Sequence, residues 1–154
     1  MKLSYISVNI YEEVFMTIKL KIYKCSICGN IVQILDEGDG NLICCGQEMN
    51  LMQIQYDTDE LGEKHTPKVI LENDKQLVNV IGHPMNKEHY IQFIETYTRD
   101  KNELHIKFFK PNEIPQMDIS FFKGKNINSI EYCNIHNLWG DNIMLQNETG
   151  SYSI

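Results

Sequence analysis

Short runs in which apolar and polar residues alternate fill the second half of the chain, from residue 67 onward. Turn residues separate six such runs, at 67–72, 76–83, 89–98, 103–110, 117–122 and 128–133. Period-two alternation over this length indicates half-buried strands, and no run here has convincing amphipathic helical character. The pattern predicts a mainly β domain, built as an antiparallel β-sandwich or a Greek-key barrel.

The segment 18–52 has a different character, because it is dense in glycine and holds four of the five cysteines. Three short strands are expected at 21–25, 31–35 and 41–44, with a hairpin turn at Asp39-Gly40 between the second and third. A segment of about thirty-five residues buries too little apolar surface to fold alone. A structural metal supplies on the order of 10 kcal/mol, so we expect a metal-stapled domain.

The remaining parts of the chain are expected to be connecting or terminal segments. Residues 1–17 form an extension, either an added edge strand or a stretch upstream of a start at Met16. The polar stretch around 56–63 predicts a linker, placed at 53–61, and the larger domain then spans 62–141. Residues 142–154 are polar and are expected to form a flexible tail.

Charge and cysteine content exclude several classes of protein. A formal net charge of -7 with a single arginine, Arg99, argues against a nucleic-acid partner. The apolar character near the start is broken by Glu12 and Glu13, so neither a signal peptide nor a membrane span is predicted, and we expect a cytoplasmic protein. An odd number of cysteines in such a chain favours metal ligands or reactive thiols over disulfides.

Two cysteine pairs predict a first metal site. Cys25 and Cys28 form a two-residue knuckle closed by Gly29, and Cys44 and Cys45 follow as an adjacent pair. Four thiolates in a small domain specify a tetrahedral site for zinc or iron, and the generic spacing alone favours a zinc ribbon. A zinc ribbon normally repeats the two-residue spacing, however, so the adjacent pair predicts a distorted site.

Three further motifs predict a second metal site. They are a Glu-Lys-His-Thr-Pro segment, two histidines at the ends of a proline-containing turn, and a Cys-x-x-His knuckle, and they contribute His65, His83, His89, Cys133 and His136. A single histidine is more often a surface or hydrogen-bonded residue, and His105, in an alternating strand, is interpreted that way.

These motifs resemble those of a known family. The pattern CxxCGN, a short hairpin and CCGxxM, from Tyr23 to Met49, resembles the small N-terminal domain of desulfoferrodoxin. The three histidine and cysteine segments, over residues 62–139, resemble the iron-binding motifs of the neelaredoxin and desulfoferrodoxin superoxide reductases. The implied fold is a rubredoxin-like metal-stapled domain followed by an immunoglobulin-like antiparallel β-sandwich. One departure is Asn137, where the family commonly has glycine.

The resemblance also implies an activity and its residues. It implies two irons per chain, an Fe(Cys)4 centre and an Fe(His)4(Cys) centre whose axial ligand is Cys133. Structural zinc is satisfied by four ligands, so these five implied ligands favour a redox iron with one vacant position. The ferrous second centre would reduce superoxide to hydrogen peroxide without evolving oxygen. Lys64 would attract the anion and organise water for its protonation, and Glu63 would occupy the vacant position in the oxidised resting state. Rubredoxin or a similar small protein would donate electrons, and a homodimer is expected.

Two other functions remain open from the residues alone. The first is a non-enzymatic electron carrier, in which the four-cysteine centre acts and the larger domain is a docking module. A vacant coordination position argues against it, because a carrier gains nothing from one. The second is a zinc-dependent structural or binding module, which metal analysis would distinguish.

Overall fold

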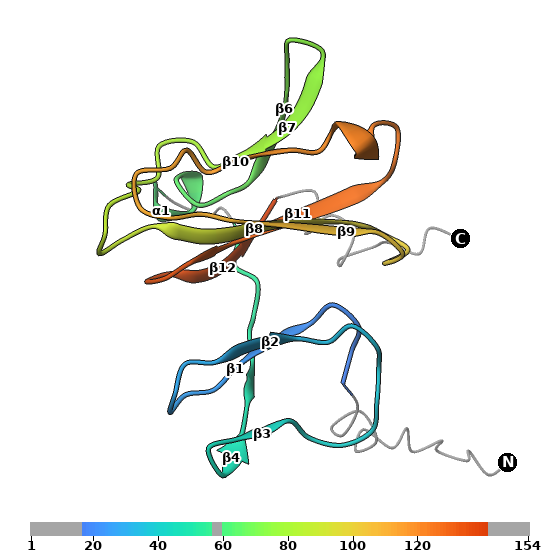
Figure 1. Ribbon diagram of the computed structural model, residues 1–154, viewed down its shortest axis with the longest axis vertical. Coiled ribbons are helices and arrows are strands. Elements are labelled where there is room, and N and C mark those ends of the chain that lie inside the picture. Colours follow the sequence, from blue (N-terminus) through green and yellow to red (C-terminus); the bar gives the residue numbers. More distant parts are fainter. Residues whose placement is uncertain (1–16, 57–59, 142–154) are drawn as a thin grey trace, which may run out of the picture. The chain divides into compact units, whose positions relative to one another are not determined.

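The computed structural model describes residues 17–56 and 60–141, so the expected tail and nearly all of the expected N-terminal extension lie outside the described residues. The chain divides between Met52 and Gln53 into two compact units, each considered by itself. None of the helices in the described ranges is long and apolar enough to cross a membrane. Figure 1 shows that strands dominate both units.

The first unit consists of five short strands: β1 (Ile22–Lys24), β2 (Ile31–Gln33), β3 (Ile43–Cys44), β4 (Gln47–Glu48) and β5 (Asn50–Leu51). One antiparallel sheet has the order β2-β1-β5, and β3 pairs separately with β4. The prediction of a hairpin at Asp39-Gly40 is therefore wrong. β2 pairs with β1, and β3, which lies within the third expected strand, pairs with β4 across a turn at Cys45-Gly46.

The second unit is an antiparallel sandwich of two sheets, shown as two layers in Figure 1. It opens with one turn of helix, α1 (Glu60–Glu63), which falls partly inside the expected linker. One sheet has the order β10-β7-β6 and the other the order β12-β11-β8-β9. Their bounds are β6 (Lys68–Glu72), β7 (Lys75–Asn79), β8 (Ile91–Thr98), β9 (Leu104–Phe108), β10 (Gln116–Asp118), β11 (Ile127–Cys133) and β12 (Asn137–Gly140), with a 3-10 turn at Ser120–Phe122. The expected mainly β, antiparallel architecture is confirmed.

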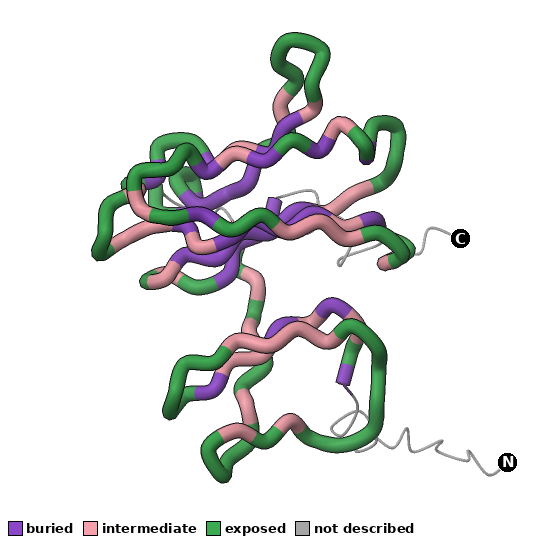
Figure 2. Tube along the Cα trace, in the orientation of Figure 1, coloured by how far each residue is buried: buried purple, intermediate pink, exposed green. Residues whose placement is uncertain are grey.

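The core of the sandwich lies between the two sheets. Val78 and Met117 come from one sheet, Ile94 and Cys133 come from the other, and all four belong to one buried cluster. Figure 2 shows the buried positions concentrated along the facing strands, with exposed positions in the hairpins and loops. The alternation of the sequence thus sets the inner faces of both sheets. Cys133 differs from the other members of this core, because its thiol can also bind a metal ion.

Candidate metal centres

The four cysteines of the first unit converge on one point. One ligand atom from each lies within 4.8 Å of the others in the group Cys25, Cys28, Cys44 and Cys45. The Cys28 and Cys44 sulfurs are 3.6 Å apart, and the adjacent Cys44 and Cys45 sulfurs are 4.0 Å apart. Four sulfurs this close are typical of a tetrahedral metal site. The residues therefore define a candidate metal centre, called the four-cysteine centre below.

Two tight turns bring these cysteines together. In the first turn the Gly29 N–H donates to the Cys25 carbonyl at 3.0 Å, and Gly29 has a φ of 78°. In the second, Cys45 and Gly46 have φ values of 53° and 78°, the signature of the two-residue turn that joins tightly twisted hairpin strands. A left-handed conformation is uncommon for a residue other than glycine, so Cys45 is held in a costly position that projects its thiol beside Cys44.

The thiols of this centre have unequal acidities. Backbone N–H groups of Cys28 and Ile27 lower the pKa of Cys25 to about 6. Hydrogen bonding with the neighbouring thiols Cys28 and Cys44 raises the pKa of Cys45 to about 12, and the pKa of Cys44 is raised by Cys28 and Cys25. Four adjacent thiolates repel one another, so full ionisation of this set requires a cation at its centre.

A second cluster lies in the sandwich unit. Ligand atoms of His65, His89, Cys133 and His136 all lie within 4.8 Å of one another. His65 Nε2 is 3.0 Å from His136 Nδ1, and Cys133 Sγ is 3.9 Å from the same His136 atom. Imidazole and thiolate are ligands of zinc, iron and copper. These residues define a second candidate centre, with three imidazoles and one thiol.

His83 lies beside this cluster and completes a ring of four imidazoles. Its ring centroid is 4.7 Å from that of His65 and 4.5 Å from that of His89. His136 closes the ring, with centroids 4.8 Å from His89 and 4.9 Å from His65. Neighbouring rings are inclined by 70° to 75°, so each presents an edge to the next. Both ring nitrogens of His83 and Nε2 of His89 are buried and have no hydrogen-bond partner among the described residues.

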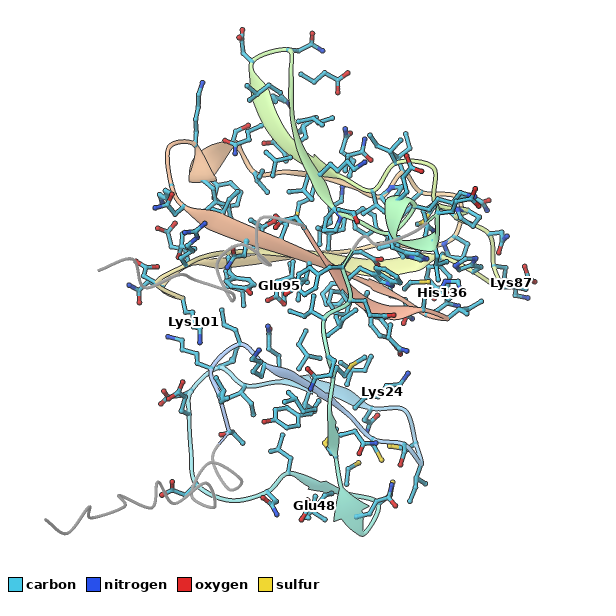
Figure 3. The ribbon with its side chains drawn as sticks, turned by 180° about the vertical axis from the view of Figure 1, so that it is seen from behind. Lys24, Glu48, Lys87, Glu95, Lys101 and His136 are labelled. Atoms are coloured by element: carbon cyan, nitrogen blue, oxygen red, sulfur yellow. The ribbon has the colours of Figure 1, made fainter. Side chains whose placement is uncertain are left out.

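The sequence positions these side chains through loops at one end of the sandwich. Gly62, in α1, accepts hydrogen bonds from the N–H groups of His65 and Thr66, at 2.9 and 2.8 Å, which fixes His65 just after the helix. Cys133 ends β11, where a β-bulge shifts the register against β8 between Tyr132 and Cys133. Bulges are common beside functional sites because they re-aim a side chain. Figure 3 shows His136 toward the end of the unit that carries Lys87 and away from Lys101.

Burial keeps the imidazoles neutral. Burial, followed by the neighbouring imidazoles, lowers the pKa of His65 to about 3 and that of His83 to about 4. The pKa of His89 is lowered for the same reasons. Burial raises the pKa of the Cys133 thiol, opposed by the backbone N–H groups of His136 and Ile135. A metal ligand must be a neutral imidazole or a thiolate, so the lowered pKa values of His65, His83 and His89 favour the binding form of these three rings.

Two further residues, Glu131 and Trp139, lie against the second cluster, and Glu131 was not predicted from the sequence. Glu131 is completely buried, and its Oε1 accepts a hydrogen bond from Nδ1 of His65 at 2.9 Å. Trp139 stacks on the His65 ring, with centroids 5.0 Å apart and planes 15° apart, and donates from Nε1 to the His136 carbonyl at 3.1 Å. In the run 128–133 Glu131 stands between the apolar Ile130 and Tyr132, as a solvent-facing residue of an alternating strand would, so no local pattern signalled its burial.

The other candidate residues of the sequence lie as follows. Glu63 and Lys64 are exposed, at the end of α1 and next to His65 along the chain. His105 was interpreted as a surface residue, but it is half-buried, with its ring 5.1 Å from that of Phe121. Asn137 has a φ of 66°, a left-handed conformation that asparagine tolerates better than most residues. The exchange of glycine for asparagine there is therefore compatible with this backbone.

A small β unit with converging thiols and an antiparallel sandwich with an imidazole and thiol cluster are the features of a protein with two candidate metal centres. The sequence matches the family described as desulfoferrodoxin, N-terminal domain, over residues 17–52, and the family described as desulfoferrodoxin over residues 57–142. The chain belongs to the desulfoferrodoxin family.

Individual proteins support this assignment. A desulfoferrodoxin homolog of Archaeoglobus fulgidus is 41% identical over 126 residues, which cover 80% of this chain and 98% of that protein. A superoxide reductase of Pyrococcus abyssi is 32% identical over 103 residues, covering 55% of this chain and 90% of that protein. The crystal structure of the superoxide reductase from Treponema pallidum has the same fold, with a TM-score of 0.58 and 20% identity, covering 79% of this chain and 96% of that one.

Proposed function

We propose that this chain is a superoxide reductase, which reduces superoxide by one electron to hydrogen peroxide without evolving oxygen. The observation that carries the proposal is the gathering of four imidazoles and one thiol, from three separate segments, at one place in a desulfoferrodoxin-family fold. Superoxide takes one electron and two protons to give hydrogen peroxide. The site must therefore supply an electron and access to protons.

The second cluster fits an iron ion with five protein ligands. The ligands we propose are His65, His83, His89, Cys133 and His136. The buried nitrogens of His83 and His89 that lack hydrogen-bond partners among the described residues support this fit, because such groups are costly unless they bind something. An iron ion held by these four imidazoles and one thiolate would supply the electron, and the Cys133 thiolate would raise the electron density at the metal.

The surrounding side chains hold the ligands in the form that this chemistry needs. Because Glu131 accepts a hydrogen bond from the N–H at Nδ1 of His65, it favours the tautomer in which Nε2 is unprotonated and can bind a metal. Trp139 covers one face of the same ring and restricts its rotation. Cys133, buried in the apolar core, is shielded from competing water.

Two exposed residues complete the proposed reaction site. We propose that Lys64 attracts the superoxide anion and orders water for its protonation. A local cation can steer an anion even in a chain whose net charge is -7. We assign to Glu63 the role of a carboxylate that would bind a metal ion held at this site when the ion is oxidised. Their exposure at the end of α1, directly before His65, supports both assignments.

The four-cysteine centre is proposed to hold a second iron. Cys28 and Cys45 are exposed, so an ion there would lie close to solvent and to an electron-donating partner. We infer that the donor is rubredoxin or a similar small protein, that the active form is a homodimer in a reducing cytoplasm, and that the functional domains span residues 18–52 and 62–141.

The decisive experiment is stoichiometric. The reduced protein is given superoxide, and the peroxide formed is compared with the oxygen evolved. One peroxide for each superoxide consumed, with no oxygen, supports reduction, whereas half as much peroxide together with oxygen indicates dismutation and contradicts the proposal. Metal analysis is the companion measurement: about two irons per chain are expected, and zinc in place of iron would support a structural module instead.

A further inference from the structure

The loop that carries His89 has little regular structure of its own. Residues 84–90 lie between His83 and β8 without helix or strand. Inside the loop, Asn86 Oδ1 accepts hydrogen bonds from the N–H groups of Glu88 and His89, at 3.1 and 2.7 Å. The Asn86 N–H in turn donates to the His89 carbonyl at 3.1 Å. These bonds shape the turn, but they do not fix its place relative to the other candidate ligands.

Asn134 supplies that connection. Its Oδ1 accepts a hydrogen bond from the Tyr90 N–H at 2.9 Å, and its Nδ2 donates to the Glu88 carbonyl at 2.9 Å. Its backbone N–H donates to the Tyr90 carbonyl at 3.2 Å. Glu88 and Tyr90 are the residues on either side of His89, so the amide of Asn134 brackets the backbone of His89.

Asn134 lies next to other candidate ligands along the chain, and its hydrogen bonds therefore link them to His89. Asn134 lies between Cys133 and His136, two other members of the second cluster. One side chain therefore joins the segment carrying two candidate ligands to the segment carrying a third. We propose that Asn134 is a positioning residue, which holds the His89 imidazole at the second centre before a metal ion binds.

His83 has a separate anchor. Met85, two residues after it, accepts a hydrogen bond at its carbonyl from the Asn112 N–H at 2.6 Å, and its side chain packs against the core. The Ile91 N–H donates to the Met85 sulfur at 3.3 Å. Loss of the Asn134 amide should therefore release His89 and leave His83 in place. This selectivity separates a positioning role from a general loss of folding.

The inference rests on the proposed function only for the identity of the ligand set, and its test does not use superoxide. The full chain, stripped of metal, is titrated with Co²⁺ in competition with a chelator. Asn134→Ala is expected to bind the second Co²⁺ about 10- to 100-fold more weakly, the range for residues that orient metal ligands. Binding at the four-cysteine centre should not change.

The spectrum of the bound ion gives the specific readout. Because the contribution of the four-cysteine centre cancels between variants at equal loading, the difference spectrum of Asn134→Ala against wild type, recorded with the second centre saturated, should show the loss of one imidazole ligand from that centre. Asn102→Ala is the matched control, since Asn102 is exposed and bonds to Asp100 in the β8–β9 hairpin, and it should match wild type.

Amide exchange in the metal-free protein provides a second measurement. Asn134→Asp keeps an acceptor for the Tyr90 N–H, so exchange of this amide should stay slow, whereas Asn134→Ala should accelerate it. Wild-type affinity and an unchanged spectrum in Asn134→Ala would overturn the proposal. The proposal would also be overturned if His83 and His89 coordination were lost equally in Asn134→Ala and in Asn134→Asp, because Asn134 would then support folding in general. If wild type fails to reduce superoxide, the proposed function falls, and these measurements still decide the role of Asn134.

Discussion

The contact between Glu131 and His65 leads to the most quantitative prediction. Both residues are buried, with exposed fractions of 0% and 1%, and the carboxylate oxygen lies 2.9 Å from Nδ1 of His65. Glu131→Leu removes the acceptor and leaves the N–H of His65 without a partner in an apolar setting. Glu131→Gln keeps an oxygen that can accept the same hydrogen bond, but it removes the negative charge.

The magnitude follows from the burial. A hydrogen bond to a charged group contributes about 1.5–3 kcal/mol, and a buried donor left unsatisfied costs about 1–3 kcal/mol. Loss of a partner that orients a metal ligand typically weakens metal binding by about 10- to 100-fold, or about 1.4–2.7 kcal/mol. Glu131→Leu should fall in that range. Burial raises the pKa of Glu131, so the carboxylate carries a desolvation cost that glutamine avoids, and Glu131→Gln should lose less affinity.

The assay is an anaerobic competition for ferrous iron between the protein and a chelator. Occupancy of the second centre is followed in the wild type and both variants, and the four-cysteine centre, in the other unit, serves as an internal control. The expected order of affinity is wild type, then Glu131→Gln, then Glu131→Leu. If Glu131→Leu binds iron as tightly as the wild type, the inference that Glu131 orients His65 is refuted.

Three further predictions concern the second centre. His89→Ala should lose the second iron and superoxide reduction while keeping the colour and metal of the first centre, and surviving activity would contradict its assignment as a ligand. Lys64→Ala should slow the reaction with superoxide by up to about tenfold and flatten its dependence on ionic strength, whereas Lys101→Ala, at the far end of the unit, should change neither. The pKa values of His65 and His83, about 3 and about 4, lie below the unfolded value near 6.5, so the unfolded chain binds more protons between these limits. Stability of the metal-free second unit should therefore fall as pH drops through this window, by at most about 1.4 kcal/mol per pH unit for each histidine. Denaturant unfolding at several pH values measures this change, and a flat profile would contradict the prediction.

Spacing along the chain was sufficient to predict most of the chemistry. The Cys25 and Cys28 knuckle and the adjacent Cys44 and Cys45 pair predicted a four-thiol cluster, because ligands a few residues apart are brought together by local turns. Alternation predicted the strands of the sandwich, because the side-chain period of a strand is fixed by its backbone. In the first unit the prediction of the strand pairing failed. The Cys45-Gly46 turn uses a left-handed cysteine, which a search for usual turn residues does not find.

The sequence by itself determined which residue types were available for metal binding and the β character of both units, since these depend on local composition and periodicity. Tertiary structure decided which side chains support them. Glu131 meets His65 across 66 positions of the chain, and Asn134 meets Glu88 across 46. No local pattern encodes such contacts, because they exist only once strand register and loop packing have brought distant segments together.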